Sequence, residues 1–231
     1  MILDVGSTIG NDLYLSAFII CNEFISYQQP RVVIVKSKVL SSLAKRIIHS
    51  QRLLDGTTKL PSQLERSTTP ILIPCVGVND YRQTIPMVVR KGDSVLEVGC
   101  HYGTTTELLH DAAVIKNKGF CAGVDVGIKI IHNAKSRYPN MTFEVVDAWN
   151  TLDLLKLKMN NSATDSSLGY DVVYADIGGL SGSSGLLESL ALLDSLGNAL
   201  QPRVIVIKSL CMKRLASQLM PISRVKVKGQ P

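Results

Sequence analysis

Four acidic residues stand at the ends of short apolar runs of the kind that form buried strands. In chain order they are Glu97, Asp125, Asp147 and Asp176. The carboxyl ends of parallel strands meet at one edge of a sheet, where ligands bind in open α/β folds, so we expect these carboxylates to lie together. Because carboxylates accept hydrogen bonds from sugar hydroxyls, their arrangement predicts a ligand that contains a nucleoside.

A glycine-containing turn comes directly after the first of these runs. The segment Glu97-x-Gly99-x-His101-x-Gly103 lies between a strand pattern and a helix that begins at Thr104. Glycine allows a strand-to-helix turn to bring its backbone close to a ligand. A nucleoside-binding sheet places its ribose-binding acid roughly 20 residues further on, and Asp125 has that spacing. A nicotinamide-binding domain would use a similar turn, but its G-x-G-x-x-G pattern is absent.

An acid and an amine end two neighbouring predicted strands. Asp176 comes after the strand predicted at 171–175, and Lys208 after the one at 203–207, so both should face one cleft. Such a pair could position an acceptor group and assist the loss of its proton. The plainer interpretation of Lys208 is an exposed charge at a strand end.

Apolar, β-branched runs alternate with helical patterns from residue 94 onward. This alternation predicts a doubly wound α/β domain, a mostly parallel sheet with helices on both faces. The predicted strands are 94–98, 120–124, 142–146, 171–175 and 203–207, with a sixth at 223–228. The predicted helices are 104–114, 129–136, one from about 149, 185–196 and 212–219.

The amino-terminal segment repeats part of this pattern. Residues 1–44 align without a gap with residues 173–216, and both stretches contain the block Q-P-R-V-x-x-x-K-S. We therefore predict that residues 1–60 form a β-α-β segment, a partial second copy of such a domain. Residues 70–231 would form the Rossmann-like domain, with the polar stretch 55–69 as the linker.

Basic residues exceed acidic ones and cluster in two segments. The chain carries a formal net charge of +6, residues 201–231 contain no Asp or Glu, and residues 29–59 contain a single acid, Asp55. Segments of this kind suit a polyanionic partner such as RNA, because they neutralise its phosphates. Solvated basic faces without a partner are the alternative.

The cysteines are scattered, odd in number and never in a C-x-x-C pair. This pattern predicts reduced thiols in an intracellular compartment, the cytoplasm by default, with the nucleus or an organelle still open, and argues against a disulfide framework or a metal site. No apolar run is long enough for a bilayer and no secretory leader is evident, so we expect no membrane segment. We interpret Cys100 as a small loop residue rather than a nucleophile, and Trp149 as a core residue, with stacking near an adenine as the alternative.

Residues 90 to about 209 resemble the class I, Rossmann-like S-adenosylmethionine-dependent methyltransferases. The resemblance rests on the turn from Glu97 to Gly103, on Asp125, on the pair Asp147-Ala148, and on Asp176. It implies S-adenosyl-L-methionine as the cofactor, with Asp125 at its ribose, Asp147-Ala148 at its adenine and Asp176 next to its methyl group. The implied cofactor-binding residues are Glu97, Gly99, Cys100, His101, Gly103, Thr104, Asp125, Val126, Asp147, Ala148 and Asp176. His101 departs from the family pattern, which usually has glycine there.

A weaker similarity links the chain to FtsJ-type RNA ribose 2′-O-methyltransferases. Asp176 and Lys208 match the central Asp and Lys of that group's K-D-K-E set, which makes them the implied catalytic residues. Residues 222–228 resemble the segment that comes after that lysine in the same group. The glutamate has no match. Three basic residues precede the turn, but none fits as the first lysine: Arg82, Arg90 and Lys91.

Three functions are consistent with these features. The first is a methyltransferase that acts on RNA or another polyanion. The second is a methyltransferase that acts on a small molecule or a protein, which the missing members of the K-D-K-E set favour. The third is a non-catalytic or truncated domain that keeps the fold as a binding module. The absent end of the predicted sheet and the amino-terminal half-repeat favour this third function.

Overall fold

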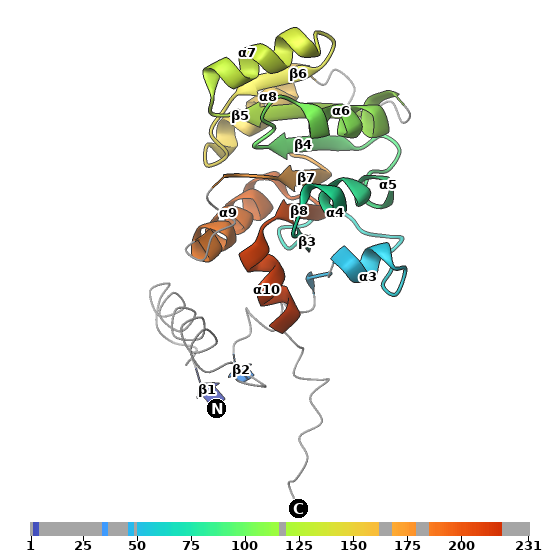
Figure 1. The fold of residues 1–231 in the computed structure, drawn as a ribbon, viewed down its shortest axis with the longest axis vertical. Coiled ribbons are helices and arrows are strands. Elements are labelled where there is room, and N and C mark those ends of the chain that lie inside the picture. Colours follow the sequence, from blue (N-terminus) through green and yellow to red (C-terminus); the bar gives the residue numbers. More distant parts are fainter. Residues whose placement is uncertain are drawn as a thin grey trace, which may run out of the picture. The chain divides into compact units, whose positions relative to one another are not determined.

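The computed structural model describes residues 2–4, 34–36, 46–48, 50–115, 119–161, 168–178 and 185–218 (Figure 1). The chain divides into two compact units. The larger unit comprises residues 48–213, and the smaller comprises residues 1–47 with 214–231.

The larger unit is built on a six-stranded parallel sheet. Its strands lie in the order β3-β8-β7-β4-β5-β6. Their bounds are β3 Ile71–Cys75, β4 Ser94–Val98, β5 Phe120–Asp125, β6 Thr142–Val145, β7 Val172–Ala175 and β8 Val204–Lys208. From β4 the chain first adds β5 and β6 on one side, and it then returns to add β7 and β8 on the other. The order therefore reverses between β4 and β7, which is the position at which open α/β sheets bind ligands.

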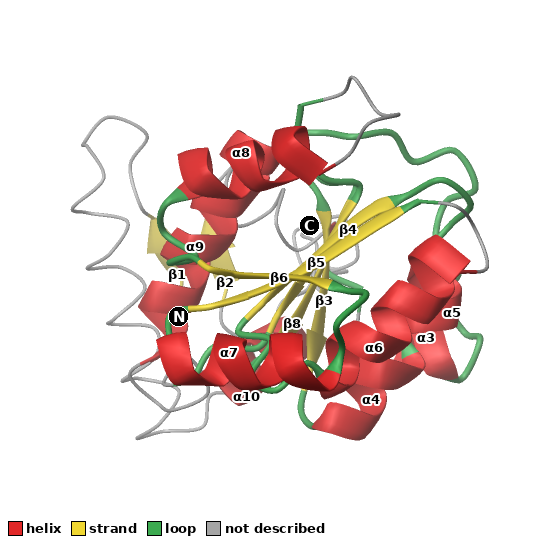
Figure 2. Cartoon of the chain, turned by 90° about the horizontal axis from the view of Figure 1, so that it is seen from above, coloured by secondary structure: helices red, strands yellow, loops and turns green. Residues whose placement is uncertain are grey.

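Helices cover both faces of this sheet, as Figure 2 shows. Helices α8 and α9 lie on one face, and α6 and α7 lie with α4 on the other. The helices of the unit are α3 Ser50–Leu54, α4 Val78–Gln83, α5 Ile85–Val88, α6 Thr104–His110, α7 Ile128–Arg137, α8 Thr151–Asn161, α9 Gly185–Leu200 and α10 Leu210–Gln218, the last of which runs past residue 213. The doubly wound α/β fold predicted from the sequence is confirmed.

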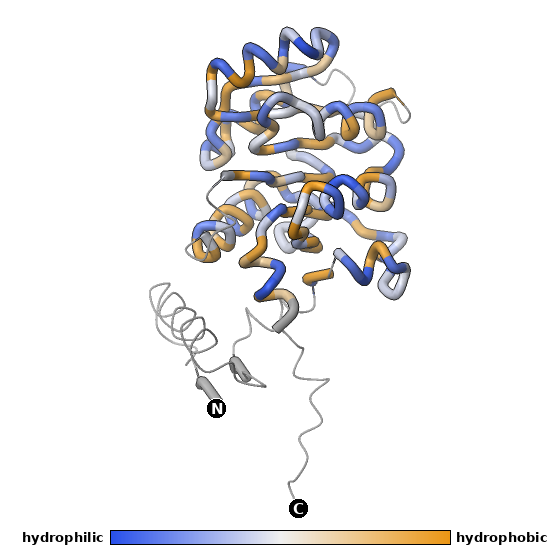
Figure 3. Tube along the Cα trace, viewed as in Figure 1, coloured by the Kyte–Doolittle hydropathy of each residue, from blue (hydrophilic) through white to orange (hydrophobic). Residues whose placement is uncertain are grey.

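The strands form the core because their residues are apolar on both faces. Every residue of β7 is buried, and β8 is buried up to Ile207. The helices contribute one apolar side each. In α7, Ile131 and Ala134 are buried, and Figure 3 shows hydrophobic and hydrophilic residues following one another along this helix. Continuous apolar strands between amphipathic helices are the pattern expected of a sheet covered on both faces.

Strand β3 is an element that the sequence did not predict. We predicted no strand between residues 60 and 94, but residues 71–75 pair with β8 along its length. Pro74 lacks an N–H group, and proline is tolerated on strands at the edge of a sheet. On the outer side of β3, Ile48 donates a backbone hydrogen bond of 2.8 Å to the carbonyl of Leu72. The edge of the sheet is therefore partly covered by the chain's own backbone.

Other predicted elements keep their place, with shifted ends. The helix predicted over 104–114 is α6, which passes into a π-helical turn over Asp111–Ile115. The strand predicted at 223–228 lies outside the described residues. None of the described helices is long and apolar enough to cross a membrane, and the described residues hold no cluster of ligands suited to a metal ion.

In the smaller unit, strands β1 (Ile2–Asp4) and β2 (Ile34–Lys36) pair in parallel, with Ile2 opposite Ile34. In the predicted repeat these two residues correspond to Tyr174 and Val206, which are opposite each other in β7 and β8. The two pairs of strands therefore share one register. The rest of the predicted β-α-β segment lies largely outside the described residues, so its assignment as a partial second copy stays a prediction.

Candidate functional site

A cavity of about 630 Å³ opens at the carboxyl edge of the larger unit's sheet. Its volume is within the range of small-molecule sites. The residues that line it come from the ends of β4 to β8 and from α4. They are Val78, Arg82, Glu97, Gly99, Cys100, His101, Tyr102, Thr104, Thr105, Val124, Asp125, Val126, Val146, Asp147, Ala148, Trp149, Asp176, Ile177, Gly178 and Lys208. The structure thus brings together every candidate catalytic and cofactor-binding residue named from the sequence except Gly103.

The turn after β4 has a backbone that requires glycine at two positions. Gly99 has φ +77°, and a Cβ there would lie 2.1 Å from the carbonyl oxygen of Asp176. Gly103 has φ +81°, and a Cβ there would lie 2.6 Å from the ring of Phe143. Gly99 therefore allows the loops after β4 and β7 to touch. Gly103 packs at the start of α6 and serves the fold rather than the cavity wall.

His101 adopts the left-handed conformation, with φ 49°. The class I methyltransferases that the sequence resembles usually have glycine at this position. Histidine tolerates this region better than most residues, although at a cost. Its backbone N–H donates a 3.2 Å hydrogen bond to Asp125 Oδ2. Its ring lies against Tyr102, with a centroid distance of 4.0 Å. The His101 backbone thus links the turn to β5, and its side chain lines the cavity.

The acids after β5 and β6 are oriented by local backbone groups. Asp125 Oδ1 accepts a 2.9 Å hydrogen bond from the N–H of Gly127. Asp147 Oδ1 accepts a 3.0 Å hydrogen bond from the N–H of Trp149, and Asp147 is exposed. An ionised carboxylate has room for about four hydrogen bonds. Both acids can therefore accept further hydrogen bonds from the hydroxyl or amino groups of a ligand.

Glu97 lies deeper than the other acids, with 2% of its surface exposed. Thr106 Oγ1 donates a 2.5 Å hydrogen bond to its Oε2. Burial raises the pKa of Glu97 to about 8, and the nearby charge of Asp176 raises it further, against the lowering effect of Thr106, Arg82 and Lys208. A carboxyl with this pKa is mostly protonated at neutral pH. It can therefore donate a hydrogen bond as well as accept one.

Asp176 and Lys208 form an ion pair across the ends of β7 and β8. Lys208 Nζ donates a hydrogen bond to Asp176 Oδ2, and the two side chains are 24% and 25% exposed. Lys208 is thus held in the cavity by a carboxylate rather than standing as an isolated charge at a strand end. The pair lies on the opposite side of β4 from Asp125 and Asp147.

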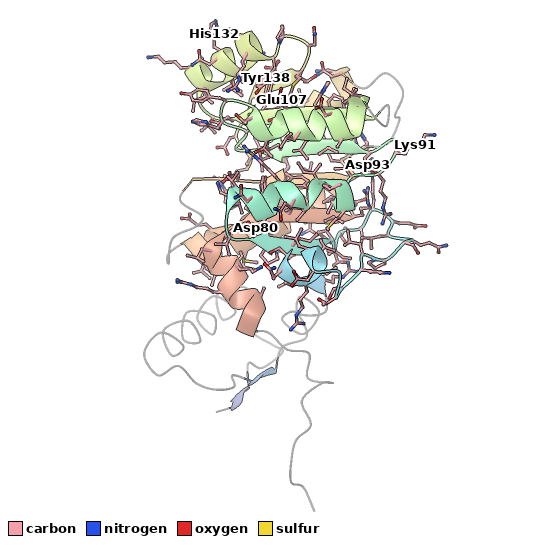
Figure 4. The ribbon with its side chains drawn as sticks, turned by 45° about the vertical axis from the view of Figure 1, so that its right-hand side comes forward. Asp80, Lys91, Asp93, Glu107, His132 and Tyr138 are labelled. Carbon is pink, nitrogen blue, oxygen red and sulfur yellow. The ribbon has the colours of Figure 1, made fainter. Side chains whose placement is uncertain are left out.

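Trp149 and Arg82 line the cavity, although the sequence did not place either of them there. Trp149 is 50% exposed and lines the cavity, so its interpretation as a core residue is wrong. Arg82 lines the cavity from α4, a short helix with no usable periodicity. The other two basic residues considered with it lie elsewhere. Arg90 donates to the carbonyl of Pro61, and Figure 4 shows Lys91 at the edge where β4 begins, pointing away from the fold.

The cysteine of the turn has no catalytic surroundings. Cys100 is buried, and its Sγ donates to the carbonyl of His101 at 3.6 Å. Burial raises the pKa of its thiol far above the ordinary value, with Glu97 and Asp125 adding to the effect. A protonated thiol is a poor nucleophile, which agrees with the interpretation of Cys100 as a small loop residue.

The sequence matches no protein-family model and no curated protein. Solved structures resemble part of the chain. A TehB-like S-adenosylmethionine-dependent methyltransferase from Corynebacterium glutamicum is 19% identical over 55% of this chain and 60% of its own, with a TM-score of 0.37. An amino pentose methyltransferase from Micromonospora echinaspora, solved with its cofactor, is 17% identical over 57% and 48%, with a TM-score of 0.40.

Fibrillarin from Aeropyrum pernix, solved with natively bound S-adenosyl-L-methionine, is 18% identical over 46% of this chain and 42% of its own, with a TM-score of 0.32. The chain thus spans about half the length of the structures that it matches. Likenesses with identities below 20% and TM-scores of 0.40 or less carry no argument about what this chain does. The strand order and the reversal between β4 and β7 define a Rossmann-like α/β fold.

Proposed function

We propose that the protein is an S-adenosyl-L-methionine-dependent methyltransferase. One observation carries the proposal: a glycine-containing turn after β4 and acids after β5, β6 and β7 line one cavity at the carboxyl edge of the sheet. Stability alone does not require that partly exposed carboxylates gather around a cavity. A ligand with ribose hydroxyls and charged groups would satisfy them.

Residues that line the cavity could contact each part of this cofactor. Asp125 would hold the ribose hydroxyls, and Asp147 with Ala148 and Trp149 would hold the adenine. The turn from Gly99 to Thr104 would hold the methionine part of the cofactor. The close contact with Asp176 restricts position 99 to glycine, and a glycine leaves the backbone of the turn free of side-chain bulk. When bound, the cofactor supplies an electrophilic methyl group.

Asp176 and Lys208 would act on the methyl acceptor. Their ion pair fixes the Lys208 ammonium at the end of β8, beside the space that an acceptor would enter. A fixed positive charge stabilises the negative charge that develops as an acceptor hydroxyl gives its proton to Asp176 or to solvent water. Asp176 would hold that hydroxyl or amine in line for attack, and correct orientation supplies much of the rate of a displacement reaction.

Calorimetric titration with S-adenosylhomocysteine, the demethylated product, tests cofactor binding. Wild-type protein should bind it, and Asp125→Ala should abolish the binding. Asp153→Ala removes an acid on α8 that is paired with Lys156 at the surface, and it should bind as the wild type does. Absence of binding by the wild type at millimolar ligand would overturn the proposal and leave a non-catalytic module with this fold.

The acceptor is identified by labelled-methyl transfer. Incubation with separate pools of total RNA, protein and small metabolites should label one of them, and Lys208→Met should lose the labelling while keeping cofactor binding. Labelled RNA would favour a methyltransferase that acts on RNA or another polyanion. Labelled protein or metabolite would favour a methyltransferase that acts on a protein or a small molecule. Binding of cofactor without transfer to any pool would contradict the catalytic roles of Asp176 and Lys208.

A further inference from the structure

Arg82 is the cation of the cavity whose terminal nitrogens are not used by the described part of the chain. Its Nε donates a 3.0 Å hydrogen bond to Thr105 Oγ1 at the start of α6. Within the described residues, no hydrogen bond or ion pair is formed by its Nη1 or Nη2. Two acids of the same cavity are already engaged, since Asp176 pairs with Lys208 and Glu97 accepts a hydrogen bond from Thr106.

The surroundings of Arg82 favour an anion from outside the chain. The side chain is partly buried and lines the cavity, and the bond to Thr105 fixes the plane of the guanidinium group. Glu97, an acid that interacts electrostatically with Arg82, is mostly protonated at neutral pH and neutralises little of its charge. An oriented guanidinium with two unused terminal nitrogens matches an oxyanion in a bidentate arrangement.

The sheet order places Arg82 on the acceptor side of the cavity. Helix α4 packs against β3 and β8, whereas the acids proposed to hold the nucleoside come after β5 and β6 on the other side of β4. Arg82, Asp176 and Lys208 line one cavity and all three interact electrostatically with Glu97, so an anion bound by Arg82 would lie near the Asp176–Lys208 pair. The chain's net charge of +6 and the absence of acids from residues 201–231 favour phosphate over an uncharged or weakly charged acceptor.

We infer that the terminal N–H groups of Arg82 bind a phosphate group of the methyl acceptor, next to the Asp176–Lys208 pair. This inference rests on the proposed function and narrows its substrate class to phosphate-bearing molecules. Nucleic acid and a free nucleotide share this chemistry. A phosphate on Arg82 would bring a neighbouring hydroxyl of the same molecule toward Asp176.

The test measures binding rather than activity. Fluorescein-labelled hexauridylate and, separately, uridine 5′-monophosphate are titrated into protein saturated with S-adenosylhomocysteine, over a series of salt concentrations. Arg82→Gln should weaken binding of at least one probe about tenfold at low salt, the loss of one charged hydrogen-bond partner. With the oligonucleotide, the slope of log affinity against log salt should fall by about one. An effect on both probes indicates phosphate recognition as such, and an effect on the oligonucleotide alone indicates a strand.

Two further variants separate the effect of losing a positive charge from the effect of losing the Arg82 guanidinium group. Arg137→Gln removes the same charge from α7, which packs against β5 and β6 at the far end of the sheet, and it should change neither affinity nor slope. Arg82→Lys keeps the charge but not the bidentate fork, so it should keep the slope and lose part of the affinity. Circular dichroism and thermal melting confirm that each variant is folded.

Three outcomes would overturn the inference. In the first, Arg82→Gln binds both probes as Arg137→Gln does. In the second, wild-type protein binds S-adenosylhomocysteine but neither phosphate probe. In the third, Arg82→Gln weakens the binding of S-adenosylhomocysteine but not the binding of 5′-methylthioadenosine, which lacks the carboxylate. Arg82 would then bind the carboxylate of the cofactor instead of a phosphate of the acceptor. All three leave the proposed function intact. Failure of the wild type to bind S-adenosylhomocysteine would instead remove the proposed function itself.

Discussion

The carbonyl oxygen of Asp176 occupies the place where residue 99 would carry its Cβ, at 2.1 Å. Gly99 and Asp176 come from the loops after β4 and β7, the two strands between which the order of the sheet reverses. The contact brings a backbone turn and a carboxylate to the same wall of the cavity. The geometry of the cofactor side thus depends on that of the acceptor side.

Gly99→Ala should therefore disrupt both the fold and the site. The new methyl group would force the two loops apart, and the positive φ would add strain. We expect a loss of about 1–3 kcal/mol in the free energy of unfolding, measured by urea denaturation, and loss of S-adenosylhomocysteine binding by calorimetry. Gly178→Ala is the control, because a Cβ there meets nothing within 4 Å. Equal stability of the two variants would show that the loops are not in contact.

Glu97 should make the protein less stable as the pH rises. Its pKa is about 8 in the folded state against an ordinary value of 4.5, so between these values the folded protein binds the proton more tightly than the unfolded chain. Stability is then lost through this window, at up to about 1.4 kcal/mol for each pH unit. Glu97→Gln should flatten the dependence. Urea denaturation at pH 5, 6, 7 and 8 tests this, and parallel curves for both proteins would refute it.

The buried pair Arg203–Asp93 should be sensitive to loss of one partner. Arg203 donates to Asp93 Oδ1 at 2.8 Å and to Oδ2 at 2.5 Å, and both residues are buried. Asp93→Asn would leave the guanidinium charge without its counterion, at a cost of about 3–5 kcal/mol in unfolding free energy. Asp153→Asn breaks an exposed pair with Lys156 and should cost no more than about 0.5 kcal/mol. Chemical denaturation measures both, and similar costs would contradict the prediction.

His101 offers a test of backbone strain. Its left-handed φ of 49° costs roughly 1 kcal/mol for a residue with a side chain, so His101→Gly should raise the free energy of unfolding by about that amount. Gln201, between α9 and β8, has the same φ, and Gln201→Gly should give a similar gain away from the cavity. If His101→Gly also tightens S-adenosylhomocysteine binding, the ring crowds the ligand. A loss of stability in His101→Gly alone would mean that its contact with Tyr102 outweighs the strain.

Much of the sheet could be predicted from sequence because its strands are continuous apolar runs, each ending at a polar residue. Asp125 and Asp176 were identified in this way, and neighbouring parallel strands bring such residues together by geometry alone. Strand β3 escaped because Pro74 interrupts its pattern and its partner β8 is distant in the chain. Arg82 was considered only as a poor match to the first lysine of the K-D-K-E set, because α4 has too few turns to show a periodicity that would place it in the cavity. Trp149 was misjudged because a lone aromatic residue gives no sign of which side of a helix or loop it occupies.

The place of β3 in the sheet has a consequence for how the chain folds. During synthesis β3 emerges long before β8, the strand on which it pairs, and the nearby ion pair between Asp93 and Arg203 joins residues 110 positions apart. Contacts this distant along the chain form slowly, and an apolar strand without its partner is prone to aggregate. Residues 71–75 therefore stay unpaired, and prone to aggregate, until β8 has been synthesised. Folding yield should depend on chaperones more than the modest size of the chain suggests.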